Sequence, residues 1–125
     1  MDKTPEMTVW TKAALPGFHC WPNAHEARDY LRARHRHLFE ITVWTVAHHD
    51  ERDTEFHDLQ DLIRAWWGPG ARELGAASCE TIARDLNDWL KATHRIRAYR
   101  IDVSEDGESG ATFTDRIIIT MTNPT

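Results

Sequence analysis

Two histidines one residue apart, His35 and His37, stand where an alternating segment begins, in the stretch RARHRHLFEITV (residues 32–43). Residues two apart on a β-strand project from the same face, with their bases about 6–7 Å apart. Two imidazoles that reach inward from such positions can meet at one ion, because a Zn–N bond is about 2.0–2.1 Å long. The spacing therefore suits a metal site, but it supplies only two ligands, and a catalytic zinc ion takes three protein ligands.

A third ligand must come from another segment, and two further histidines are candidates. His19 lies at the end of a predicted strand, and His25 lies in the connection that follows it. A simpler interpretation competes with metal binding: the chain has eight histidines, so a His-X-His pattern can arise by chance at the polar end of a strand. The spacing alone leaves both interpretations open.

The segments that must position these histidines differ in the period of their apolar residues. Alternation predicts four strands, in residues 8–18, 36–47, 99–105 and 113–121. Helical spacing predicts two helices between the second and third strands, one from Phe56 to Trp67 and one that begins after Ser78, a good N-cap. The order ββααββ predicts an α+β fold, in which an antiparallel four-stranded sheet carries both helices on one face.

The composition indicates one ordinary globular domain, expected to span residues 1–125. The chain is 41% hydrophobic and 28% charged, and its net charge of −5 argues against a nucleic-acid partner. No segment approaches membrane-spanning length and no signal-peptide pattern is found, so we expect no membrane partner and a cytoplasmic location. The cysteines, Cys20 and Cys79, are accordingly expected to be reduced.

The second predicted strand is apolar on both faces. One face carries Phe39, Ile41 and Val43, and the other carries Leu38, Trp44 and Val46. We therefore expect cover on both sides, from a helix layer or from another subunit. A sheet with both helices on one face also leaves its edges open, which predicts a homo-oligomer.

Several short motifs, in their order along the chain, resemble the 6-pyruvoyl-tetrahydropterin synthase / 6-carboxy-tetrahydropterin synthase (QueD-like) family, which has the tunnelling fold (T-fold). HRH (35–37) is similar to the family's His-Gly-His, and LPGFHCWP (15–22) to its Phe-x-Ala-Ala-His-x-Leu-Pro. EFHDL (55–59) and ASCE (77–80) are similar to its Asp-Phe-x-x-Leu and Pro-Thr-x-Glu. The resemblance covers about residues 8–115 and is closest to shortened members such as those carried by phages.

The resemblance implies a zinc ion held by His19, His35 and His37. It also implies that Glu105, in VSEDGESGA (103–111), clamps a pterin ring. A carboxylate can do this because it accepts two parallel hydrogen bonds from the N–H edge that pterins share with guanine. A solvent-facing acid in an acidic turn is the competing interpretation of Glu105. The family assembles trimeric barrels stacked in pairs, which implies a trimer or a hexamer.

Two departures from the family affect its proton-transfer groups. The family has a cysteine four residues before its His-x-His, where this chain has Leu31. It also has an Asp-His pair between the helices, whereas GARELGAAS (70–78) contains neither residue. The standard family mechanism therefore cannot be assumed for this chain.

Other residues are candidates to replace the missing groups. Cys79 falls in the first turn of the second helix, where the helix dipole is expected to lower the pKa of a thiol. Ser78 and Cys79 occupy the motif that lines the family's pterin pocket, although Cys79 also reads as a small buried residue. His57 could join a site formed between subunits, or serve only at the surface near the start of its helix. Cys20 is expected in the core.

These features favour a zinc-dependent carbon–oxygen lyase as the function. The resemblance implies a substrate like dihydroneopterin triphosphate, or a related pterin or purine, as in the biosynthesis of 7-deazaguanines such as queuosine. Two alternatives remain: a module that binds zinc and the ring without turnover, and a purely structural T-fold oligomer.

Overall fold

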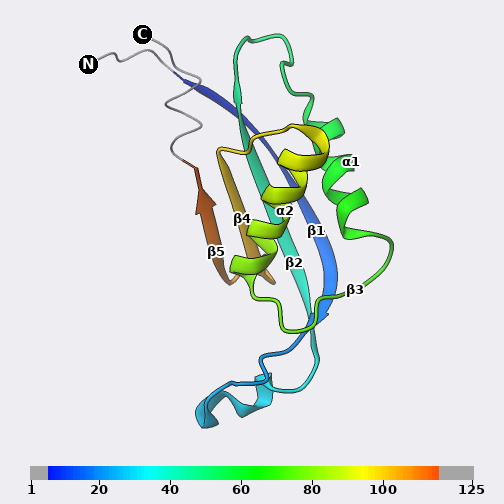
Figure 1. Ribbon diagram of the computed structural model, residues 1–125, viewed down its shortest axis with the longest axis vertical. Coiled ribbons are helices and arrows are strands. Elements are labelled where there is room, and N and C mark those ends of the chain that lie inside the picture. The colour runs from blue at the N-terminus through cyan, green and yellow to red at the C-terminus, as the bar shows by residue number, and fades with distance from the viewer. Residues whose placement is uncertain (1–5, 116–125) are drawn as a thin grey trace, which may run out of the picture.

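The computed structural model describes residues 6–115, which form a mixed α+β fold with a five-stranded sheet (Figure 1). The strands are β1 (Met7–His19), β2 (His35–Ala47), β3 (Arg72–Glu73), β4 (Arg100–Glu105) and β5 (Ser109–Thr114). The helices are the 3₁₀ helix η1 (Glu26–Leu31) and the α-helices α1 (Phe56–Trp67) and α2 (Cys79–His94). None of the described helices is long and apolar enough to cross a bilayer.

The sheet has the order β3-β1-β2-β4-β5. Its centre is the antiparallel pair β1–β2, which runs from Met7 opposite Ala47 to His19 opposite His35. The two-residue strand β3 pairs in parallel with the end of β1, beside the histidines. The prediction of an α+β fold is confirmed, but that of four strands is wrong, because β3 adds a fifth to the edge.

Both α-helices cover one face of this sheet (Figure 1). Helix α1 packs against β1, and α2 packs against β4 and β5. The predicted inward face of β2 is confirmed, because Phe39, Ile41 and Val43 are all fully buried in the core. The core forms on this face because the strands place alternate residues there and both helices turn their apolar stripes toward it.

The ends of the helices agree with the local sequence. The Ser78 hydroxyl accepts a hydrogen bond from the backbone N–H of Thr81, which confirms the predicted N-cap of α2. At α1 the Glu55 carboxylate accepts from the N–H of His57. This hydrogen bond is the largest cause of the lowered pKa of Glu55.

The opposite face of the sheet is only partly covered within one chain. Trp10 and Leu38 point away from the helices and are 56% and 38% exposed. Trp10 lies beside Trp44 across the β1–β2 pair, with ring centroids 6.3 Å apart. Among residues 6–115, the expected cover on both sides of β2 is therefore supplied on one side only.

A tight hairpin joins β4 to β5. Asp106 and Gly107 both have positive φ, and the N–H of Glu108 bonds to the carbonyl of Glu105. An Asp-Gly pair suits such a turn, because both residues tolerate that conformation. This turn starts β5 at Ser109, four residues before the predicted start of the last strand at 113, and residues 116–121 of that prediction lie outside the described residues.

Candidate metal centre

Three histidines meet on the helix-covered face at one end of the sheet. His19 ends β1, and His35 and His37 begin β2. Their ring nitrogens that could bind a metal all lie within 4.8 Å of one another. This group contains the three predicted ligands and could hold a metal ion. His25 is not in it, because it lies in the exposed connection with its ring 5.7 Å from that of Trp21.

Each of these histidines uses Nδ1 for a hydrogen bond outside the group. The acceptors are the carbonyl of Ala77 for His19 (2.9 Å), the carbonyl of Ala33 for His35 (2.9 Å) and the carboxylate of Asp106 for His37 (2.7 Å). A carbonyl oxygen can only accept, so Nδ1 of the first two carries the proton and Nε2 presents a lone pair. Metal-binding histidines are usually held in this way, with one nitrogen donating to an oxygen and the other free for the ion.

The free nitrogens are buried without a hydrogen bond. The Nε2 atoms of His19 and His37 are buried and have no hydrogen-bond partner among the described residues. Their side chains are 9% and 18% exposed. A buried polar atom without a partner costs free energy, and a cation bound between these nitrogens would remove that cost. The donor set therefore fits a divalent metal that accepts imidazole ligands, zinc among them.

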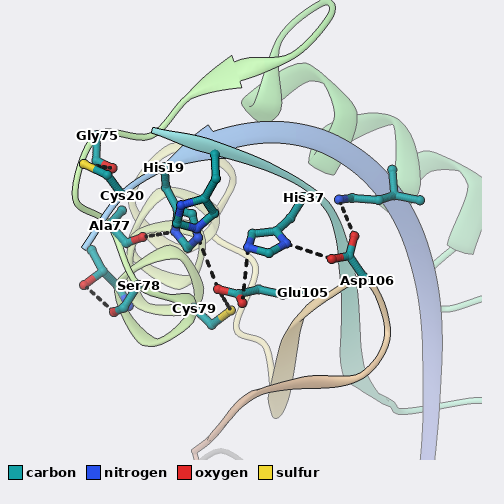
Figure 2. Close-up of polar contacts among 12 residues, drawn as sticks. His19, Cys20, His37, Gly75, Ala77, Ser78, Cys79, Glu105 and Asp106 are labelled. Carbon is teal, nitrogen blue, oxygen red and sulfur yellow. Dashed lines mark hydrogen bonds and ion pairs between the residues drawn. The ribbon is translucent and has the colours of Figure 1, made fainter. Parts of the chain in front are cut away.

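The side chain of Glu105 reaches this group from the end of β4 (Figure 2). Its Oε2 is 3.3 Å from Nε2 of His19, and its Oε1 is 3.4 Å from Nε2 of His37. The hairpin directly after it carries Asp106, so one strand end supplies two carboxylates around His37. The structure thus places Glu105 at the metal centre and does not leave it in solvent.

Cys79 is buried at the start of α2 and faces the same carboxylate. Its thiol donates to Oε2 of Glu105, with sulfur and oxygen 3.9 Å apart. Burial, followed by the charges of Glu105 and Glu80, raises the pKa of Cys79 to about 12. The expectation of a lowered pKa is wrong, because burial and two nearby carboxylates outweigh the helix N-terminus. At neutral pH this group is a thiol that helps to hold Glu105.

A cavity of about 450 Å³ opens beside the histidines. Its lining includes His19, His35, Leu31, Ser78, Cys79 and Glu105. The three predicted substrate-binding residues, Ser78, Cys79 and Glu105, therefore share one cavity with two of the metal-ligand candidates. Leu31 is also on the wall of this cavity. The resemblance puts this residue at the position of a cysteine, so the replacement of that cysteine by leucine falls within the site.

Two further candidate residues, His57 and Cys20, have different surroundings. The side chain of His57 is 79% exposed at the start of α1, with its Nδ1 3.2 Å from Glu55, and it does not line the cavity. This position agrees with the surface role that was its alternative, and a place in a site between subunits stays a prediction. Cys20 was expected in the core, but the structure places it elsewhere. It follows the last residue of β1, is half-buried and lines the cavity, with its sulfur 3.6 Å from the carbonyl of Gly75.

Sequence reasoning missed Asp106 and Trp21. Asp106 orients His37, and Trp21 lines the cavity while remaining 45% exposed. The only signal for Asp106 was its place next to Glu105 in an Asp-Gly turn. Trp21 had the weaker signal of an aromatic residue two positions after His19.

No protein-family model matches the chain. A search of the curated proteins likewise found no match. Inferences about function therefore rest on the site itself and on the motifs that carry the resemblance.

Proposed function

We propose that this chain is a zinc-dependent lyase of the pterin-synthase type, with a T-fold, that acts on dihydroneopterin triphosphate or a closely related pterin or purine. One observation carries the proposal: three imidazoles lie close together beside Glu105, and two of them, His19 and His35, line one cavity with that carboxylate. The order of the motifs along the chain agrees with it. The 7-deazaguanine pathway is the proposed context.

Support for the ring comes from Glu105 and the size of the cavity. Glu105 lines the cavity, and a carboxylate can match the N–H edge of a 2-amino-pyrimidinone. A cavity of about 450 Å³ is within the range of small-ligand pockets. A flat bicyclic ring held by Glu105 can present its side chain to the histidines once this carboxylate turns away from them.

The proposed reaction needs an acidified C–H or O–H group on the pterin side chain. Zinc, when bound, would supply this by polarising the side-chain oxygens. The chain itself orients the ring through Glu105, and the Cys79 thiol holds that carboxylate. The apolar wall at Leu31 contributes to the exclusion of water but cannot move a proton.

A second candidate function is binding of zinc and a ring without turnover. Leu31 and the raised pKa of Cys79 favour it, because neither position offers a base at neutral pH. The absence of an Asp-His pair between the helices also favours binding without turnover. The two functions share one site and differ only in whether product forms.

We also propose a homo-oligomer, a trimer or a hexamer, as in other T-fold proteins. Exposed Trp10 and Leu38 on the face without helices support this, as does the edge strand β5. Apolar side chains and open strand edges are stabilised when a second copy covers them. The oligomer would bring further residues to the cavity.

Incubation with dihydroneopterin triphosphate and zinc tests the proposal. We expect conversion to a tetrahydropterin or a related product, detected by chromatography, and none with His35→Ala. Binding of the compound without product would favour the second candidate. Absence of both binding and product in the zinc-loaded protein would contradict both functions.

A further inference from the structure

The distances between Glu105 and the histidines are those of ligands around one ion. Two atoms that are each about 2.0–2.1 Å from a tetrahedral zinc ion lie about 3.3–3.4 Å from each other. The oxygens of Glu105 are 3.3 Å from Nε2 of His19 and 3.4 Å from Nε2 of His37. The carboxylate is therefore already at ligand distance from two of the three nitrogens.

These contacts are not ordinary hydrogen bonds. The Nε2 atoms of His19 and His37 have no hydrogen-bond partner among the described residues, although the carboxylate oxygens are so close. In the neutral imidazole, the Nδ1 hydrogen bond from His19 to the Ala77 carbonyl leaves Nε2 without a proton to donate. A lone pair and a carboxylate oxygen in contact repel each other, and a cation between them turns that repulsion into binding.

We infer that Glu105 is the fourth protein ligand of the metal centre while no ring is bound, and that it leaves the metal to bind the ring. This inference rests on the proposed function and adds a control step to it. Three histidines and a carboxylate make a closed site, whereas a catalytic zinc keeps one position open. Entry of the ring edge opens that position, because Glu105 cannot give both oxygens to the ring and remain a ligand.

Two neighbours fit an exchangeable ligand. The Cys79 thiol, 3.9 Å from Oε2 of Glu105, remains a hydrogen-bond donor at neutral pH and can steady the carboxylate in either position. Glu105 is also the last residue of β4, directly before the hairpin. Its side chain is 33% exposed, so it has room to turn toward the cavity, unlike the buried His19.

Cobalt substitution tests the inference without relying on activity. Four-coordinate Co²⁺ absorbs in the visible region, and the position and strength of its bands change when one ligand replaces another. We expect the bands of Glu105→Gln and Glu105→Ala to differ from those of the Co²⁺-loaded wild type, because water replaces the carboxylate. The affinity for Zn²⁺ should fall in both variants by at least 10–100-fold, roughly the cost of losing an outer-shell partner. Glu108→Gln, an exposed acid in the same hairpin, is the matched control and should leave both unchanged.

Addition of the ring compound gives a second test that uses the same absorption band. Adding 7,8-dihydroneopterin to the Co²⁺-loaded wild type should change its spectrum as Glu105 is withdrawn. His35→Ala, which keeps only His19, His37 and Glu105 as ligands, should bind Co²⁺ much more weakly than the wild type. Unchanged spectra and Zn²⁺ affinity in Glu105→Gln and Glu105→Ala would overturn the fourth-ligand inference and leave the three-histidine site intact. A wild type that binds neither Co²⁺ nor Zn²⁺ would overturn the proposed function as well.

Discussion

Asp106 ties His37 to the start of β2. Its Oδ2 accepts from Nδ1 of His37 at 2.7 Å, and its Oδ1 accepts from the backbone N–H of Leu38 at 2.8 Å. The backbone hydrogen bond and then His37 hold the pKa of Asp106 below its usual range. The carboxylate therefore stays ionised and fixes both the position and the proton of the imidazole, as the outer ligands of metal sites do.

Asp106→Asn should weaken metal binding without removing a ligand. Asparagine tolerates the left-handed backbone at this position but has only one acceptor oxygen for two donors. We expect the affinity for Zn²⁺ to fall by roughly 10–100-fold, measured by competition with a chelator. Asp102→Asn, which removes a carboxylate paired with Arg100 on the opposite face, should leave it unchanged. An equal loss of Zn²⁺ affinity in both variants would mean that Asp106 does not orient a metal-binding histidine.

The two cysteines should differ sharply in reactivity. Cys79 is 6% exposed and its pKa is raised to about 12, whereas Cys20 is half-buried at the cavity. At pH 8 iodoacetamide should therefore modify Cys20 well before Cys79, as followed by mass spectrometry of digested protein. Because the folded pKa of Cys79 lies above its ordinary value of 9.0, its contribution to stability is full below that value and is lost as the pH rises toward 12. Faster labelling of Cys79 would contradict the position given to its thiol.

Gly17→Ala should destabilise the fold near the histidines. An added Cβ would lie 2.9 Å from the Trp67 ring and 3.1 Å from the Phe39 ring, both of which are buried. We expect a loss of about 1–3 kcal/mol in the free energy of unfolding, measured with a chemical denaturant. The matched control is Lys12→Ala on the exposed face of the same strand, whose ion pair with Glu40 contributes little. Full stability of Gly17→Ala would show that Trp67 packs less closely than described.

Leu31→Cys should increase turnover if catalysis is retained. Leu31 lines the cavity at the place of the family's proton-transfer cysteine. A restored thiol could move a proton to or from the substrate, and such groups contribute about 10²–10⁴-fold. We expect initial rates with dihydroneopterin triphosphate to rise at least tenfold, and Leu31→Ser, of similar size to cysteine but a weaker acid, to give no rise. No gain in Leu31→Cys would favour binding without turnover.

Much of this fold and the metal centre could be predicted from local patterns. Alternation placed His35 and His37 on the face shared with Phe39, whereas the register that sets His19 opposite His35 comes from the structure. Helical spacing gave the bounds of α1 and the Ser78 cap gave the start of α2, since these signals are encoded within a few residues. These features depend on near neighbours and need no knowledge of the tertiary structure.

Other features depended on contacts between distant segments. Strand β3 has only two residues, and its pairing with β1 arises from the path of the chain after α1. The pKa of Cys79 could not be inferred from its place in the helix, because Glu105 is 26 positions away in the sequence. Asp106 likewise reaches His37 across 69 positions. Spacing pointed to His35 and His37 as candidate ligands, and only the folded chain showed what surrounds them.

The metal content of the purified protein shows whether the three histidines bind zinc. The protein is saturated with Zn²⁺, freed of excess metal by gel filtration and analysed by elemental mass spectrometry, with His35→Ala and His25→Ala treated in parallel. We expect one zinc ion per chain in the wild type and in His25→Ala, and much less in His35→Ala. A wild type that retains no zinc, or a His35→Ala variant that retains as much, would contradict this expectation.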